Sequence, residues 1–201
     1  MSENELGNVL TICSPQQMAS ALVRAWRELF DETPAKQSVC ILLSQWAEET
    51  GWGHSCHCWN IGNFKHIPGD GRCFTYFQCN EIINGKRVIF DPTIENDRPY
   101  CCFRAYLTPE EGTLDYLASI YKQFREVWPA VLKGNPIEFA HILKLRGYYT
   151  APELTYTTAI VSLFTQFSRL SFSEKDTAKF SEEERAQILA LVSLTSRELT
   201  P

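Results

Sequence analysis

The sequence contains no apolar run that approaches the roughly 18 residues of a membrane-spanning helix. It has no low-complexity tract, and charged residues make up only 21% of its 201 positions, which argues against a disordered chain. An excess of positive charge is also missing. Nineteen Lys and Arg against 24 Asp and Glu give a net charge of −5, so we expect neither nucleic acid nor an anionic membrane as a partner. The remaining composition, 44% hydrophobic with 12% aromatic residues, is typical of one globular domain with a full apolar core.

The N-terminus and the cysteine content bear on where the chain acts. The segment Met1-Ser2-Glu3-Asn4-Glu5 is acidic and only a short apolar stretch follows it, whereas a secretory signal begins with basic residues and has a longer apolar region. We therefore expect a chain made without a cleaved leader. Eight cysteines are too few for a disulfide-built scaffold. We expect reduced thiols, with disulfides formed in an oxidising compartment as the alternative.

The segment Cys56-His57-Cys58 raises the question of a metal site. Its C-x-C spacing differs from that of zinc-binding cysteine pairs, and no second close pair completes a set of four ligands. We predict no metal site and no cofactor.

Apolar residues recur at helical spacing in five segments of the chain. The first follows Ser14-Pro15, an N-cap with proline at the first helical position, and predicts a helix over 15–30. A second helix is predicted at about 35–50, because Gly51-Trp52-Gly53 supplies a C-terminal stop. Three more helices are predicted at about 114–128, 136–145 and 153–170.

Helical periodicity disappears between residues 54 and 113. Two apolar and aromatic runs, 74–83 and 86–90, are separated by Asn84-Gly85, a dipeptide that tolerates the positive φ angles of a tight hairpin turn. This pattern predicts a small β-lobe between helical segments. The expected fold class is therefore α+β and mainly helical.

The last part of the chain is expected to form a separate unit. Ser181 and Glu184 have the spacing of a capping box, and apolar residues follow at 188–192. We divide the chain into a domain over 1–170 and a C-terminal helical extension over 171–201. A delivery machine or an inhibitor protein is the kind of partner that this extension would contact.

Glu49 is the first candidate catalytic residue. It lies three residues after Trp46 and seven after Leu42, so it shares the apolar face of the second predicted helix, in its last turn. Partial burial raises the pKa of a carboxyl group, and an acid that stays protonated near neutral pH can act as a general acid. The alternative is a helix-end carboxylate that caps the helix or forms an ion pair. Its neighbour Glu48 is expected to be solvated.

Glu81 is the second candidate. It lies three residues before Asn84, near the tip of the predicted hairpin, and shares a strand face with Cys79 and Ile83. A carboxylate on a hairpin can face a helix-borne acid across a groove, as glycoside hydrolysis commonly requires. Spacing alone supports this pairing weakly, because the chain has 24 acidic residues.

Five short motifs add to this interpretation. In chain order they are Glu49-Thr50-Gly51-Trp52-Gly53, the W-N-I-G-N-F-K segment 59–65, Glu81-Ile82-Ile83-Asn84-Gly85, Phe103-Arg104-Ala105-Tyr106 followed by Asp115-Tyr116, and Gly147-Tyr148 with Pro152. Their sequences and order resemble those of the family 73 glycoside hydrolases, which are β-N-acetylglucosaminidases that cleave peptidoglycan. The resemblance covers about residues 15–170. Two departures from the family pattern, Ala151 in place of an aspartate and Tyr149 in place of a small alanine, affect the expected shape of the cleft.

The resemblance implies a lysozyme-like α+β fold with a sugar-binding cleft between its lobes. It implies that Glu49 is the catalytic acid, that Glu81 is the second carboxylate, acting as a base or steadying a charged intermediate, and that Tyr148 lines the cleft beside the scissile bond. The phenol of Tyr148 would hydrogen-bond the N-acetyl group, which can itself supply the nucleophile. The expected substrate-binding residues are Trp52, Trp59, Asn60, Tyr76 and Tyr149, with ordinary core packing as the alternative for the three aromatic residues Trp52, Trp59 and Tyr76.

The expected function is hydrolysis of β-1,4 bonds in peptidoglycan glycan strands, by a monomeric endo-β-N-acetylglucosaminidase. A muramidase or a lytic transglycosylase on the same fold is a close alternative. A thiol peptidase that uses Cys40 with His141 and a non-catalytic glycan-binding module are the others. Because the substrate lies outside the cytoplasm, we expect action in the periplasm or outside the cell. Delivery would use a phage lysis system, a contractile injection machine or a specialised exporter.

Overall fold

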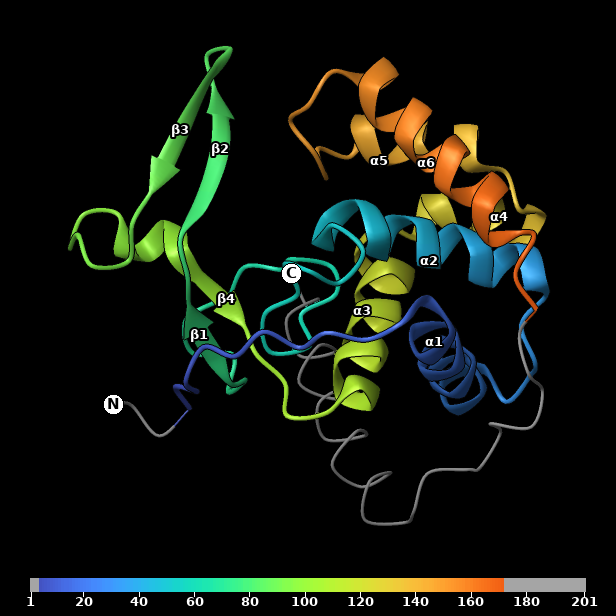
Figure 1. Ribbon diagram of the computed structural model, residues 1–201, viewed down its shortest axis with the longest axis horizontal. Helices are drawn as coiled ribbons and strands as arrows, with labels where there is room; N and C mark the ends of the chain where they lie inside the picture. Colours follow the sequence, from blue (N-terminus) through green and yellow to red (C-terminus); the bar gives the residue numbers. More distant parts are fainter. Residues whose placement is uncertain (1–3, 172–201) are drawn as a thin grey trace.

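The computed structural model describes residues 4–171, which form a helical lobe and a β-lobe side by side (Figure 1). The helical lobe contains six α-helices and the β-lobe four short strands among the described residues. This agrees with the predicted α+β, mainly helical class. None of the described helices is long and apolar enough to cross a membrane. The helix predicted after Ser181 lies outside the described residues, and the proposed division at residue 170 stays a prediction.

The first two helices begin and end close to their predicted limits. Helix α1 spans Pro15–Phe30, and Ser14 and Gln17 form a reciprocal capping box at its start. Helix α2 spans Lys36–Thr50 and ends where Gly51 adopts a left-handed conformation, with φ of 54°. The stop predicted from the glycine is therefore confirmed.

The later helices agree less closely with the prediction. Helix α3 spans Pro109–Gln123 and starts earlier than predicted, because the side chain of Thr108 caps it. The prediction that this helix ends near Trp128 was wrong: a 3₁₀ turn follows α3, and Trp128 opens a short helix, α4, over Trp128–Lys133. Pro129 fits there because proline is tolerated in the first helical turn. Helices α5, Pro136–Leu145, and α6, Glu153–Phe167, follow.

Helix α2 forms the centre of the helical lobe. It packs against α1, α4 and α6, so nearly all its side chains are buried. Its core residues include Leu42, Leu43 and Trp46, which have no exposed surface. Only the C-terminal end of α2 reaches the boundary with the β-lobe, and this end carries Glu48 and Glu49.

The β-lobe consists of two separate antiparallel pairs. Strand β1, Phe74–Tyr76, pairs with β4, Cys102–Arg104, and strand β2, Cys79–Ile83, pairs with β3, Lys86–Phe90. Both turn residues of the β2–β3 hairpin have positive φ, as predicted. The single run predicted over 74–83 was wrong, since the chain leaves the first pair after Tyr76 and enters the second at Cys79. In Figure 1 the hairpin rises from the β1–β4 pair and lies across from α5 and α6.

A buried ionic cluster connects the β-lobe to α3. Asp115 of α3 is 3% exposed, and its Oδ2 accepts hydrogen bonds from Arg104 at 2.8 Å and from the Tyr106 hydroxyl at 2.5 Å. Its Oδ1 lies 3.3 Å from Arg72, which also pairs with Asp70. One of the five motifs, Phe103-Arg104-Ala105-Tyr106 with Asp115-Tyr116, thus connects the β-lobe to α3.

Candidate active site

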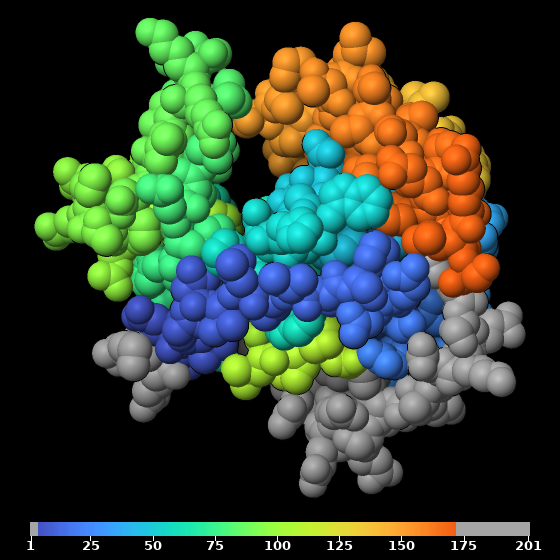
Figure 2. All heavy atoms as spheres, in the orientation of Figure 1, coloured from blue at the N-terminus to red at the C-terminus, as the bar shows by residue number. Residues whose placement is uncertain are grey.

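An open groove separates the two lobes. It has a volume of about 730 Å³ and is lined by the end of α2, the segment 55–65, the start of β2, the end of α3 and the turn before α6. Figure 2 shows it as the gap between the β2–β3 hairpin and the α5–α6 region. Glu49, Glu81, Tyr148 and Tyr149 all line this one groove. The structure therefore brings together the three predicted catalytic residues.

Glu49 is held at the groove by contacts from two elements, the 59–65 loop and α6. The Asn63 side-chain amide donates to the Glu49 backbone carbonyl at 2.6 Å. The Tyr156 hydroxyl of α6 donates to Glu49 Oε1 at 3.2 Å. Behind it, the Tyr116 hydroxyl of α3 donates to Gln45 Oε1 of α2 at 2.5 Å. Glu49 thus lies at the end of α2, with Tyr116, Tyr148 and Tyr156 around it.

Burial raises the pKa of Glu49 to about 7, partly offset by the hydrogen bond from Tyr156, while the charge of Glu48 raises it further. Its place in the last turn of α2 works in the same direction, because the helix dipole disfavours a negative charge there. The carboxyl group is therefore half protonated near neutral pH, the state that a general acid needs. Glu48 itself is exposed, as expected.

Tyr148 lies in the turn between α5 and α6. Its hydroxyl donates to the backbone carbonyl of Gly62 at 3.1 Å, and its ring packs edge-on against Phe64 and Phe124. Burial raises the pKa of the phenol well above its ordinary value, and the nearby Glu49 charge adds to this. Tyr148 is therefore a neutral hydroxyl held against the wall of the groove.

Glu81 lies on β2, on the opposite side of the groove. Its Oε1 is 3.6 Å from Lys65 Nζ, and both side chains are about 40% exposed, at 39% and 42%. Lys65 Nζ also donates to the Tyr100 carbonyl at 2.5 Å and lies 3.9 Å from the centre of the Phe103 ring. The second carboxylate is thus solvated and held beside a cation, in contrast to the desolvated Glu49.

An aromatic stack forms part of the groove wall on the β-side. The His57 ring stacks on Phe77 at 4.0 Å, and Phe77 stacks on Phe103 at 4.1 Å. His57 Nδ1 lies 2.6 Å from Asn8 Oδ1, and burial lowers the pKa of the imidazole. Both faces of Phe77 are covered within this stack, and Lys65 lies over the Phe103 ring, so these rings make the groove wall apolar without offering free faces to a sugar.

Four predicted substrate-binding residues lie outside the groove lining. Trp52 is 39% exposed and packs against Phe167, and Tyr76 lies under the Arg98 guanidinium at 4.3 Å. Asn60 is 1% exposed, and its amide bonds to the backbone of Phe64 and Arg104, so it shapes the loop from within.

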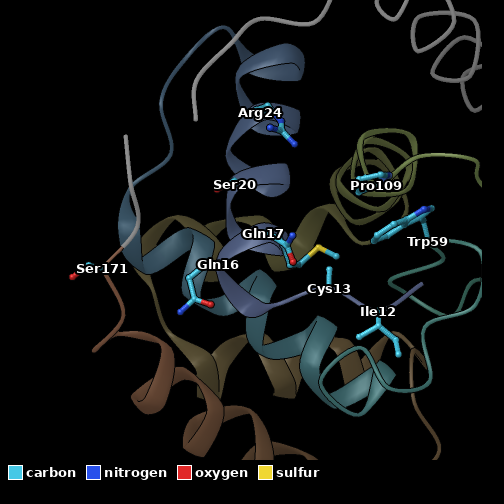
Figure 3. A pocket seen from close by; sticks show the side chains of 10 residues that line it. Ile12, Cys13, Gln16, Gln17, Ser20, Arg24, Trp59, Pro109 and Ser171 are labelled. Carbon is cyan, nitrogen blue, oxygen red and sulfur yellow. The ribbon is translucent and has the colours of Figure 1, made fainter. Parts of the chain in front are cut away.

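Trp59 lines a second cavity, of about 450 Å³, beside α1 (Figure 3). There it lies with Pro109 opposite Cys13 and Gln17. Both Trp52 and Trp59 have positive φ, so each occupies a backbone turn. A part in substrate binding for these two tryptophans therefore stays a prediction.

The eight cysteines are all free thiols in the structure. Cys40 is completely buried in α2 and burial raises its pKa, which is unfavourable for a nucleophile. His141 is exposed and pairs with Glu153 at 2.7 Å. The thiol-peptidase alternative therefore has no support from these positions. Among residues 4–171, no three or more His, Cys, Asp or Glu side chains gather in a group that suits a metal.

Three solved structures share this architecture. A peptidoglycan hydrolase mutant from Sphingomonas sp. A1 aligns with a TM-score of 0.55 at 21% identity, covering 87% of this chain and 99% of that one. A C-terminally truncated glycoside hydrolase domain from Salmonella typhimurium FlgJ aligns with a TM-score of 0.50 at 19% identity, covering 79% of this chain and 100% of that one. The chain has the fold of these hydrolases. The peptidoglycan hydrolase from Sphingomonas sp. A1 also aligns, with a TM-score of 0.51 at 19% identity, covering 88% of this chain and 94% of that one. No family model and no curated protein matches the sequence.

The peptidoglycan-hydrolase fold also brings to the groove residues that sequence reasoning had not assigned to it. Tyr156 lies in the helix predicted at about 153–170, and its hydroxyl donates to Glu49. Asn63 lies in the 59–65 motif and Phe77 in the run predicted over 74–83, but neither pattern assigned these side chains to the groove. For Tyr156 a signal was available, since a tyrosine in an apolar helical stripe needs a partner for its hydroxyl.

Proposed function

We propose that this chain hydrolyses β-1,4 glycosidic bonds of peptidoglycan as an endo-β-N-acetylglucosaminidase. One observation carries the proposal: a desolvated carboxyl with a pKa of about 7 lines the same groove as a solvated carboxylate on the opposite lobe. Two carboxyl groups in contrasting environments are the arrangement in which one acts as acid and the other stays ionised. The fold shared with peptidoglycan hydrolases supports the choice of substrate.

In the proposed reaction, Glu49 gives its proton to the glycosidic oxygen while the bond from that oxygen to the anomeric carbon breaks. Water adds its oxygen to the anomeric carbon, and Glu81 takes the proton that this water loses. Solvent then returns a proton to Glu49 and removes one from Glu81. Tyr148 lies at the groove wall beside Glu49, and because its proton goes to the Gly62 carbonyl, its phenol oxygen can accept a hydrogen bond from the N–H of the N-acetyl group of the sugar.

The test is release of reducing sugar from purified cell wall by the full chain. We expect Glu49→Gln to lower kcat by at least about 100-fold, the usual contribution of general acid catalysis. Glu81→Gln should have a loss of similar size if it serves as the base. Glu95→Gln is the matched control, because Glu95 is an exposed carboxylate outside the groove. Full activity in Glu49→Gln contradicts the proposal.

Mass spectrometry of the fragments distinguishes the alternatives. New reducing ends on N-acetylglucosamine support the proposed linkage, and reducing ends on N-acetylmuramic acid indicate a muramidase. Anhydro-sugar products together with an active Glu81→Gln variant indicate a lytic transglycosylase, which needs one acid only. Wall binding without turnover by the wild-type chain indicates a non-catalytic module.

We also propose that the protein acts as a monomer on the cell-wall side of the membrane, in the periplasm or outside the cell. This follows from the substrate, which is found there. Contact of the C-terminal segment with a delivery machine or an inhibitor remains part of this proposal. Deletion of residues 172–201 tests it, since unchanged delivery removes the suggestion.

A further inference from the structure

The side chains around Glu49 include a pair of tyrosines that the proposed reaction does not use. The rings of Tyr149 and Tyr156 stack face to face, with centroids 3.8 Å apart and an interplanar angle of 13°. The Tyr149 hydroxyl donates to the Ala140 carbonyl of α5 at 3.0 Å, and the Tyr156 hydroxyl donates to Glu49 Oε1 at 3.2 Å. A continuous line of contacts therefore runs from α5 through the turn and α6 to the end of α2.

We propose that Tyr156 and Tyr149 are positioning residues for the acid Glu49: Tyr156 holds its carboxyl group by a hydrogen bond, and Tyr149 holds the Tyr156 ring by stacking. The inference rests on the proposed function, in which Glu49 is the proton donor. Neither tyrosine is assigned a chemical step. Besides the sugar contact expected from the sequence, Tyr149 thus helps to position Glu49 by stacking on the Tyr156 ring.

The hydrogen bond decides which carboxyl oxygen carries the proton. Glu49 Oε1 accepts from Tyr156, and an oxygen that accepts a hydrogen bond from a hydroxyl donor is the disfavoured place for the acidic proton. The proton is therefore carried by Oε2, which leaves it available to the glycosidic oxygen. Loss of the Tyr156 hydroxyl would free both oxygens and reduce the fraction of productive orientations.

The same bond opposes the effect of burial on the acid. A hydroxyl that donates to a carboxylate stabilises the charged form, so Tyr156 lowers the pKa of Glu49 while desolvation raises it. The titratable groups that face Glu49 are Glu48 of α2, Tyr116 of α3, Tyr148 of the turn and Tyr156 of α6. Of the three tyrosines, it is Tyr156 whose hydroxyl donates to the carboxyl group.

Tyr156→Phe tests the pair by removing the hydroxyl and keeping the ring. Activity requires protonated Glu49, so the alkaline limb of kcat/KM follows its pKa. We expect this limb to move upward by about one pH unit, the equivalent of one hydrogen bond to a charged group. We expect kcat near pH 6 to fall severalfold with little change in KM, because the lost hydroxyl is bonded to the acid. An unchanged limb overturns the proposal.

Two variants at Tyr149 distinguish the effect of ring stacking from the effect of the hydroxyl group. Tyr149→Phe keeps the ring and should keep most of the wild-type pH profile, whereas Tyr149→Leu removes the stack and should move the alkaline limb in the same direction as Tyr156→Phe. A change in KM alone in Tyr149→Leu overturns the role given to Tyr149. Tyr121→Phe is the matched control, since Tyr121 packs on Trp128 away from the groove.

A measurement that needs no substrate, the titration of Glu49, tests this inference independently of the proposed function. ¹³C-labelled glutamate in the full chain, assigned with Glu49→Gln, reports the titration of Glu49 by NMR. We expect a midpoint near 7 in the wild type and a higher one in Tyr156→Phe. If Tyr156→Phe does not fold, the ¹³Cζ signal of Tyr156 in the wild type must follow the same midpoint. If the Glu49 midpoint shifts in Tyr156→Phe but the wild type does not turn over peptidoglycan, the proposed function alone is contradicted. If the Glu49 midpoint is the same in both proteins, the positioning role of the two tyrosines is contradicted.

Discussion

Lys65 Nζ lies 3.6 Å from Glu81 Oε1, so the carboxylate on the β-lobe has a cation beside it. Both side chains are about 40% exposed, and exposed ion pairs contribute roughly 0–1 kcal/mol. Lys65→Met should therefore lower kcat/KM by no more than about fivefold, far less than Glu81→Gln. Steady-state kinetics on purified wall measures both. A loss in Lys65→Met as large as that in Glu81→Gln would show that the cation itself acts in catalysis.

Glu49 should make the stability of the protein depend on pH. Its folded-state pKa of about 7 lies above the ordinary value of 4.5, so the folded state holds the proton more tightly than the unfolded state. The stabilisation from this group is fully present below pH 4.5 and is lost as the pH rises through 7.

We therefore expect Glu49→Gln to be more stable than the wild type at pH 8 by roughly 1–3 kcal/mol, with a smaller difference at pH 5. Urea denaturation at the two pH values measures this. Glu95→Gln should follow the wild type at both. Equal free energies of unfolding for the wild type and Glu49→Gln at pH 8 would mean that burial of this carboxyl has little energetic cost.

Asp115→Asn should destabilise the protein strongly. It removes the charge that faces Arg72 and Arg104 in a cluster where all three side chains are almost fully buried. Breaking a buried ion pair from one side typically costs about 3–5 kcal/mol, because the partner charge stays buried and uncompensated. Thermal and urea denaturation measure the loss. The matched control is Glu126→Gln, which breaks the exposed pair with Arg146 and should cost under about 1 kcal/mol.

Gly112→Ala should also destabilise the fold, although alanine is the better helix former by about 1 kcal/mol. A Cβ at Gly112 would lie 2.1 Å from the Trp59 backbone oxygen, so α3 or the 59–65 loop must move. Overpacking of this kind costs typically about 1–3 kcal/mol, which exceeds the gain in helix propensity. Gly7→Ala is the control, because nothing lies within 4 Å of its added Cβ. A Gly112→Ala variant as stable as the wild type would contradict the close contact.

Local chemistry accounts for most of the secondary structure that could be predicted. The Ser14 cap, the Gly51 stop and the Asn84-Gly85 turn each act within a few residues, so α1, α2 and the hairpin followed from the sequence. Strand β4 and the break after Tyr76 depend on partners distant in the chain, and no local pattern indicated them.

By itself the sequence singled out the two candidate carboxyl groups: an acid on the apolar face at the end of a helix, and a carboxylate near a hairpin tip. Only the tertiary structure decided that both line one groove, that Asn60, Trp52, Trp59 and Tyr76 have other contacts, and that Tyr156 completes the surroundings of Glu49. The physical reason is that helix and strand periods specify the face on which a side chain lies. Packing between distant segments decides what lies against that face. Glu49 and Tyr156, for example, are 107 residues apart, and the burial that results from such packing raises the pKa of Glu49.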